Sequence, residues 1–303
     1  MLGCGGVPSP TNPVALHPPE LELMAALPIE APENFQPSGL WVEEGRLLVV
    51  SDKHDATIYE LALEAEHAAA RPFAHFARPS EAVDMLDLEG LSGDGAGGFW
   101  LASEGAFRVA SVGVARTEDA SGPSGRALWI TPSLRAAGEA AGCFQINNAG
   151  FEGLARLDAQ RLLLAIERQP RGLVEVALGS GGPKVVVQTM AESSYALPHG
   201  RPADFSDLSV AEGEVYALMR NGHLVVRLER REGAWVEGQG ASYAAAENDP
   251  RYIYADATFG LAEGLALTQD RIFIVLDNNG QARASAPADF RPLLFIFRRP
   301  PGF

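Results

Sequence analysis

Short apolar runs recur along the chain and predict β-strands joined by turns. One unit appears five times: a small or acidic residue, then Gly or Asp, then Leu, and after a turn an apolar run that ends in a polar or charged residue. Its copies start at Ser38, Glu89, Glu152, Asp207 and Glu263, where Asp207 is aligned to the glutamates through the leucine that follows it. The starts lie 51, 63, 55 and 56 residues apart. A repeat of this length with three or four strands per unit is typical of a β-propeller.

The repeat predicts an all-β fold, a single β-propeller of five blades over residues 20–303. A sixth blade is expected only if the 63-residue interval hides an irregular one. The last copy leaves room for three strands, and the apolar run at 21–27 stands unpaired before the first copy. We therefore expect this N-terminal strand to complete the final blade and close the ring. Residues 60–71 and 133–141 score as helices, although each falls where a blade needs an outer strand or a loop.

Composition narrows the class of protein. The 303 residues include 24 Lys and Arg against 39 Asp and Glu, a net charge of −15, which argues against binding to nucleic acid or to anionic lipid. Hydrophobic residues make up 47% of the chain, enough for a sizeable core, yet no stretch approaches the roughly 18 apolar residues of a membrane span. The only cysteines are Cys4 and Cys143, so a disulfide framework and a cysteine-based metal site are excluded.

The first 19 residues predict a Gly- and Pro-rich tether. Leu2, Gly3 and Cys4 resemble the end of a bacterial lipobox, in which the cysteine is lipidated after the signal peptide is cleaved. This interpretation requires a signal peptide upstream of the given sequence. It predicts an exported protein, periplasmic or anchored to the outer membrane as a lipoprotein. The alternative is a disordered, Gly-rich start.

The repeated motifs resemble a known family. Residues 87–91, 150–155 with 165–168, 204–209 and 262–266 are similar to the family described as esterase-like activity of phytase, and also to the SdiA-regulated group of periplasmic propellers. The resemblance implies a propeller, a location in the bacterial envelope or outside the cell, and divalent cations, calcium in particular. Propellers host unrelated functions, so enzyme activity does not follow from the fold.

The repeated acids point to a metal site independently of that resemblance. The innermost strand of each blade lines the central channel, so the repeat would bring four carboxylates toward one axis: Glu89, Glu152, Asp207 and Glu263. Like charges repel and raise one another's pKa unless a cation or arginines compensate. Oxygen ligands in this number suit Ca²⁺ better than Zn²⁺. The alternative is that each acid caps backbone N–H groups where its own strand begins.

A second repeated position follows the next strand. It holds Asp52, Glu104, Glu167, Arg220 and Asp277, with Arg168 next to one of them. Arg168 and Arg220 could grip the anion of a phosphate or carboxylate ester, while Glu104 and Glu167 could position water or hold a second cation. The alternative is that these residues make salt bridges between blades.

Two functions remain open from the sequence. One is a metal-dependent phosphoesterase or esterase, which would act at the channel mouth on a small anionic or ester substrate. The other is a non-catalytic binding or scaffold module that holds an envelope ligand and has a structural metal at its axis. The Gly-x-Ser-x-Gly motif of serine hydrolases and the His-Glu-x-x-His motif of zinc proteases are both absent from the sequence.

Overall fold

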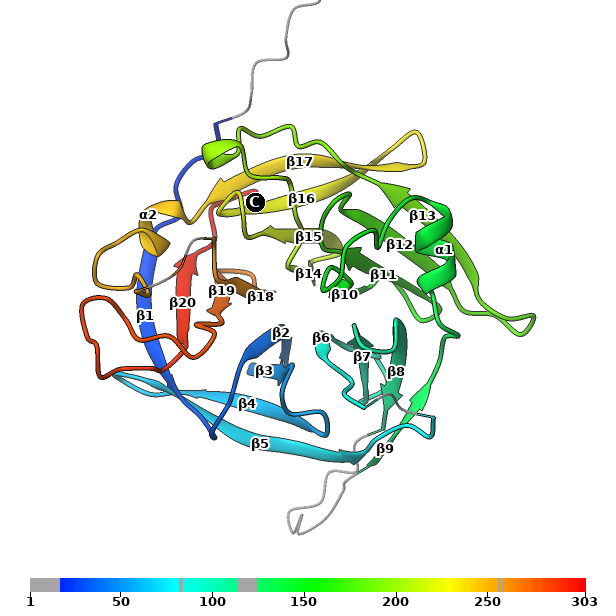
Figure 1. The fold of residues 1–303 in the computed structure, drawn as a ribbon, viewed down its shortest axis with the longest axis horizontal. Helices are drawn as coiled ribbons and strands as arrows, with labels where there is room; N and C mark the ends of the chain where they lie inside the picture. The colour runs from blue at the N-terminus through cyan, green and yellow to red at the C-terminus, as the bar shows by residue number, and fades with distance from the viewer. Residues whose placement is uncertain (1–16, 82–83, 114–124, 256, 258) are drawn as a thin grey trace, which may run out of the picture.

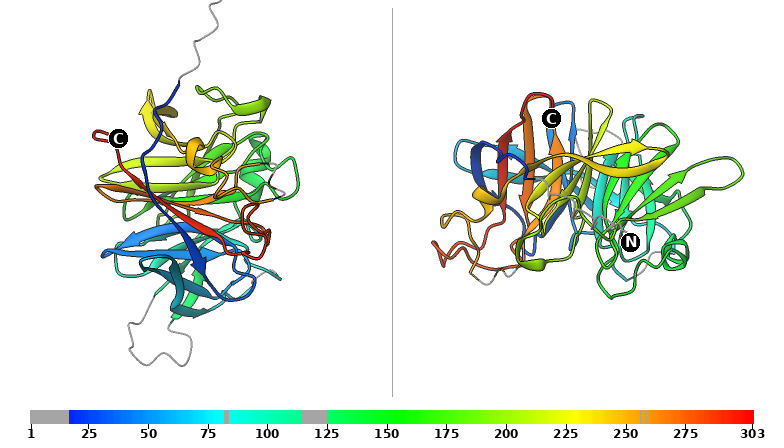
Figure 2. Two further views of the ribbon diagram at one scale, coloured as in Figure 1. Left: turned by 90° about the vertical axis from the view of Figure 1, so that its left-hand side faces the viewer. Right: turned by 90° about the horizontal axis from the view of Figure 1, so that it is seen from above.

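Antiparallel strands lie in groups of four around a central axis (Figure 1). The computed structural model describes residues 17–81, 84–113, 125–255, 257 and 259–303. Residues 1–16, and with them Cys4 and most of the predicted tether, lie outside this part of the chain. Figure 2 shows the same strands from two further sides, with loops at both ends of the ring.

Each group is numbered from its innermost strand outward. The first contains β2 (Pro37–Glu43), β3 (Arg46–Ser51), β4 (Thr57–Leu63) and β5 (Ala68–Ala77). The second contains β6 (Leu88–Gly93), β7 (Phe99–Ser103), β8 (Arg108–Val112) and β9 (Gly125–Trp129). The third contains β10 (Phe151–Arg156), β11 (Arg161–Ile166), β12 (Gly172–Ala177) and β13 (Lys184–Thr189). The fourth contains β14 (Asp207–Ala211), β15 (Glu214–Met219), β16 (Leu224–Arg231) and β17 (Ala234–Ser242).

The fifth group joins the two ends of the strand order. It contains β18 (Ala262–Leu267), β19 (Arg271–Leu276), β20 (Leu293–Arg298) and, as its outer strand, β1 (Leu23–Glu30). Strand β1 runs antiparallel to β20, with Leu27 opposite Leu294, so the prediction that the N-terminal strand completes the last unit is confirmed. Short parallel contacts also join β1 to β5 and β5 to β9.

The core lies between neighbouring groups, and this explains the continuous apolar runs. In β11, Leu162, Leu164 and Ile166 pack toward the second group, whereas Leu163 and Ala165 pack toward the fourth. A strand that is covered on both faces has no polar side, so its sequence does not alternate. Buried clusters of the same kind fill all five interfaces around the ring.

The two stretches with helical composition have different outcomes. Residues 60–71 cross from β4 into β5, because Leu61 and Ala68 are buried in the core between groups and this packing overrides local propensity. Residues 133–141 contain the helix α1 (Arg135–Ala140). A second helix, α2 (Ala244–Glu247), and the 3₁₀ turn η1 (Pro198–Gly200) lie in other connections. In the described part of the chain, no helix has the length and apolar character needed to cross a membrane.

The long connection from β13 to β14 is fixed by a buried arginine. Arg171 has no exposed surface, and its Nη2 donates to Glu237 Oε1 at 2.5 Å and to the carbonyl of Glu192 at 2.8 Å. Its Nε donates to the carbonyl of Met190, and its guanidinium lies over the Phe205 ring. One side chain thus ties the start and the end of this connection to β17, and the connection delivers residues 202–204 to the axis.

Candidate functional site

A cavity of about 540 Å³ opens at the axis, where the innermost strands begin and the second strands end. Its lining is dominated by acids. The carboxylates are Asp52, Asp87, Glu89, Glu104, Glu152, Glu167, Glu263 and Asp277, and the cationic side chains are Lys53, Arg168 and Arg220. Seven of the eight predicted site residues therefore meet in one space, and Asp207 does not line it.

The three repeated glutamates reach the cavity through a shared irregularity in strand pairing. Leu88 pairs with Ser103 and Gly90 with Ala102, so Glu89 is an extra residue between them. Glu152 and Glu263 stand at the same shift in β10 and β18. A bulge of this kind re-aims the side chain of the extra residue. The glycine that follows allows the innermost strands to touch, because a Cβ on Gly90 would lie 2.7 Å from the Cβ of Leu154.

The alignment of Asp207 with the glutamates is wrong by one residue. Asp207 pairs with Leu218 and Leu208 with Ala217, with no shift at the start of β14. In β10 the corresponding pairs start with Gly153, so Asp207 stands at the glycine position and Ser206 at the glutamate position. The shared leucine gave the wrong offset because it follows the glutamates by two residues and Asp207 by one.

The Asp207 carboxylate joins three strand groups at the axis. Its Oδ1 accepts the Leu208 N–H at 2.7 Å, and its Oδ2 accepts the N–H groups of Leu265 at 2.7 Å and Leu40 at 3.3 Å. These donors belong to β14, β18 and β2. Burial raises the pKa of Asp207 well above its ordinary value, while the three hydrogen bonds oppose that rise. Its surroundings match the predicted alternative, an acid that caps backbone N–H groups.

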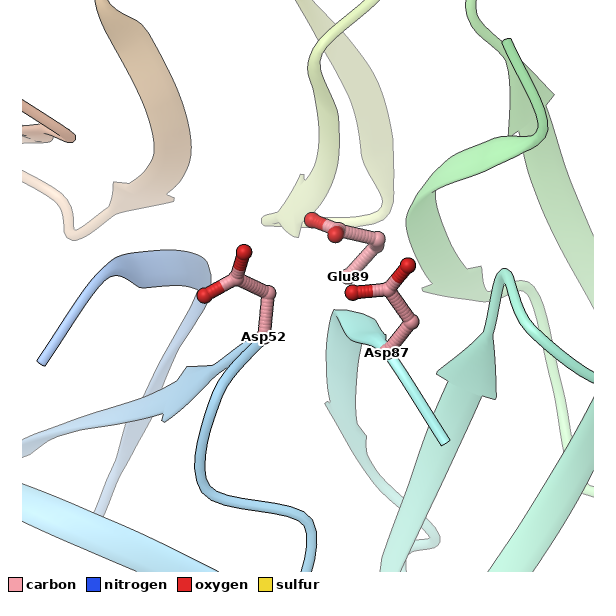
Figure 3. A group of neighbouring side chains, drawn as sticks. All are labelled: Asp52, Asp87 and Glu89. Atoms are coloured by element: carbon pink, nitrogen blue, oxygen red, sulfur yellow. The ribbon is translucent and has the colours of Figure 1, made fainter. Parts of the chain in front are cut away.

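Three carboxylates form a compact cluster at one side of the cavity. Asp52, Asp87 and Glu89 each offer an oxygen, and these atoms lie within 4.8 Å of one another (Figure 3). Asp52 follows β3, and Asp87 lies in the loop before β6 with a φ of 54°. Asp87 was missed as a site residue because the other repeats have no acid two positions before the glutamate. We call these three residues the acidic triad.

The opposite side of the cavity holds the two predicted arginines in ion pairs. Arg220 donates through Nη1 to Glu263 and through Nη2 to Glu167, and its Nε lies 3.6 Å from Asp204 Oδ2. Arg168 also pairs with Glu167. The same contact, Arg220 to Glu263, connects the second position of one repeat with the first position of the next.

Burial raises the pKa of most of these acids. It raises the pKa of Glu104 to about 7, with a further rise from Asp87, while the Gly150 N–H that Glu104 Oε1 accepts at 2.7 Å opposes it. Burial also raises the pKa of Glu263 to about 7 against the effect of Arg220, and the pKa of Asp277 to about 6. The carboxyls thus hold protons near neutral pH, and a divalent cation would displace them.

Several cavity oxygens have no hydrogen-bond partner among the described residues. They are Asp52 Oδ1, Glu167 Oε2 and Glu263 Oε2, all buried. Buried polar atoms are normally satisfied by protein, water or an ion. The donor set consists of carboxylate oxygens, which fits a hard cation such as Ca²⁺ or Mg²⁺. The residues present therefore fit the predicted metal.

Comparison with known proteins agrees with this fold. The chain is similar to the PQQ-bound aldose sugar dehydrogenase from Streptomyces coelicolor, with a TM-score of 0.51 and 14% identity over 93% of this chain and 100% of the other. It is also similar to the glutaminyl cyclase from Myxococcus xanthus, with a TM-score of 0.53 and 15% identity over 94% of this chain and 100% of the other. These likenesses concern the fold alone: the chain is all-β and matches β-propeller proteins.

A search of curated proteins found no match. The family model described as "Esterase-like activity of phytase" matches residues 37–280, a range that starts with β2 and extends beyond β19. This range contains all the residues that line the cavity except Gln36 and Gln281. The chain is therefore a member of the phytase-like family.

Proposed function

We propose that this protein is a divalent-cation-dependent ester hydrolase that acts in the central cavity of a five-bladed propeller. The observation that carries the proposal is the acidic triad, in which Asp52 Oδ1 is buried without a partner beside the 540 Å³ cavity. The family description supports the reaction class, since it names an esterase-like activity. The five strand groups would be the blades, and β1 would close the ring.

Calcium is the cation that we propose for the acidic triad. A bound divalent cation polarises an ester oxygen and lowers the pKa of water. Glu152 and Glu263, the other predicted ligands, line the same cavity and would hold a second cation. Asp207 is left out of the proposed ligand set because both of its oxygens already accept backbone hydrogen bonds.

The residues of the chain itself would orient and protonate the reactants. In hydrolysis the oxygen of water bonds to the acyl carbon, the bond from that carbon to the alcohol oxygen breaks, and the alcohol takes up a proton. Glu104 is fixed beside Asp87 by the Gly150 N–H, so its carboxyl is placed to exchange that proton. Arg168 and Arg220 would hold Glu167 and Glu263 in position at the far side of the cavity.

We also propose that the protein is exported. The residues at issue are 1–16, whose Cys4 would carry the lipid of a periplasmic or outer-membrane lipoprotein. Support comes from the lipobox-like sequence and from the resemblance to exported propellers. Expression with an upstream bacterial lipoprotein signal, followed by fractionation of wild type and Cys4→Ser, tests the anchor. The proposal predicts membrane association for the wild type only.

Thermal unfolding tests the metal site. The protein would be stripped with a chelator and titrated with Ca²⁺, Mg²⁺ and Zn²⁺, because a ligand that binds only the folded state raises Tm. We expect Ca²⁺ to raise Tm of the wild type and of the control Glu214→Gln, whose side chain is exposed and outside the cavity lining. Asp87→Asn and Glu89→Gln should lose the response. A wild type that responds to no metal would contradict the proposal.

A non-catalytic metal-binding module is the second candidate. It is favoured by the pairing of both arginines, since guanidinium groups already bonded to Glu167 and Glu263 are not open to a substrate anion. The two candidates differ in turnover. If Ca²⁺ stabilises the protein but no carboxylic or phosphate ester is hydrolysed between pH 5 and 8, the binding module is the better description.

A further inference from the structure

The cavity has no cationic side chain that is open to an anion. Of the three that line it, Lys53 pairs with Asp52, Arg168 pairs with Glu167, and Arg220 is shared between Glu167 and Glu263. Eight carboxylates surround these three cations. A cation bound at the acidic triad would still leave the carboxylates of Glu152, Glu167 and Glu263 facing the remaining space.

The rim of the cavity is polar but uncharged. Its lining includes the side-chain amides of Gln36, Asn148, Gln169 and Asn279, of which the last three are exposed at the mouth. An amide offers both donors and acceptors, and a carboxylate offers acceptors, so together they match hydroxyl groups. The backbone of Gln169 has a φ of 57°, a conformation for which glutamine has no preference. Residues held in such conformations cluster at binding sites.

One aromatic ring adds apolar surface to this rim. Phe259 lines the cavity and is 59% exposed, which is unusual for a large apolar side chain. The guanidinium of Arg201 lies 5.4 Å from the ring centroid, and Arg201 is not part of the cavity lining. The exposed part of the ring can cover the C–H face of a sugar or an acyl group.

We propose that the central cavity takes an uncharged, hydroxyl-rich ester, an acylated sugar or polyol, in preference to a phosphorylated one. This inference rests on the proposed ester hydrolysis and names its substrate class. A phosphate monoester carries a charge of about −1.5 to −2 at neutral pH. It would enter a space where every cation is already paired with a carboxylate, so repulsion is not offset. Hydroxyl groups, in contrast, can donate to those carboxylates and exchange hydrogen bonds with the rim amides.

A matched pair of esters of one sugar tests the proposal. The probes are 6-O-acetylglucose and glucose 6-phosphate, with the calcium-loaded wild type. Hydrolysis is followed by release of acetate or phosphate, and binding is followed separately by ligand-observed NMR. We expect kcat/KM for the acetyl ester to exceed that for the phosphate ester by at least tenfold, with the same order in binding.

The outcomes separate the substrate class from the reaction. Preferred turnover of glucose 6-phosphate would overturn the substrate class while leaving ester hydrolysis intact. Tighter binding of 6-O-acetylglucose without turnover of either probe would support the class and count against hydrolysis. Tighter binding of glucose 6-phosphate, or no detectable binding of the acetyl ester at 10 mM, would overturn the class.

Two variants test the stated causes. Glu263→Gln removes one partner of Arg220, so relative binding of glucose 6-phosphate should rise at least threefold. Phe259→Ala removes an exposed ring and should weaken binding of the acetyl ester without lowering Tm. The control is Glu214→Gln, which should change neither. Unchanged selectivity in both test variants would contradict the assignment of selectivity to paired charges and the rim.

Discussion

Asp207 should stabilise the whole ring rather than bind metal, and its substitution separates these roles. Asp207→Ala leaves three buried N–H groups without an acceptor, those of Leu40, Leu208 and Leu265. An unsatisfied buried donor costs about 1–3 kcal/mol, so the three together cost about 3–9 kcal/mol. Removing a buried carboxylate with a raised pKa returns part of this cost. We expect a net loss of about 3–5 kcal/mol, within the range for breaking buried charged interactions.

Asp207→Asn should be milder. Its amide oxygen can still accept from Leu265 and Leu40, which leaves the Leu208 N–H unpaired at a cost of about 1–3 kcal/mol. Urea unfolding followed by tryptophan fluorescence measures both losses, with Glu214→Ala as the exposed control. The reasoning is refuted if Asp207→Ala lowers the free energy of unfolding by less than about 1 kcal/mol, or if the alanine and asparagine variants are equally damaging.

The same variant separates a cap from a ligand. Because Asp207 does not line the cavity, Asp207→Asn should keep the rise in Tm that Ca²⁺ produces, although its starting Tm is lower. Loss of that response in a folded Asp207→Asn protein would return Asp207 to the metal site. The Ca²⁺ response of Glu89→Gln, measured alongside, gives the behaviour expected of a ligand.

Three further predictions concern charge. The pKa values of Glu104 and Glu263 are raised by burial to about 7, so the stability that they contribute is present at pH 5 and lost as pH rises through 7. Without metal, the free energy of unfolding should fall from pH 5 to pH 8 by up to about 3 kcal/mol per carboxyl, and a flat profile in urea titrations would contradict this. Arg171→Met should lower that free energy by about 3–5 kcal/mol, and adding Glu237→Gln should restore part of it, because an unpaired buried charge is the main cost; the double variant being the weaker one would argue otherwise. Arg220→Met should increase the number of Ca²⁺ ions bound at saturation in equilibrium dialysis, since a cation can replace the guanidinium, and an unchanged number would count against that exchange.

Much of the fold was predictable because the packing imposes a simple pattern. Runs such as Leu162 to Ile166 are buried on both faces, so they stand out from the turns whatever their exact register. The register itself is set by pairing between strands, which composition does not reveal. Asp207 and Gly153 occupy equivalent positions only because β14 lacks the shift seen in β10, and no local sequence feature announces that difference.

The site was predictable as a meeting place but not as a set of contacts. Repeat symmetry brings Glu89, Glu152 and Glu263 to one cavity, as predicted. It could not find Asp87, which occurs in one repeat only, nor could it show that Arg220 bridges two acids from different groups. Such pairings depend on which side chains face each other across the axis, and this is decided by the geometry of the closed ring.

The pairing of β1 with β20 has a consequence for biosynthesis. The strand Leu23–Glu30 is made early by the ribosome, but its partner Leu293–Arg298 is among the last strands to be made. Until then the exposed backbone of the early strand can pair with other chains. Contacts between residues this far apart in sequence also slow folding. The nascent protein should therefore depend on chaperone protection late in synthesis, and a variant that joins β20 directly to β1 should not.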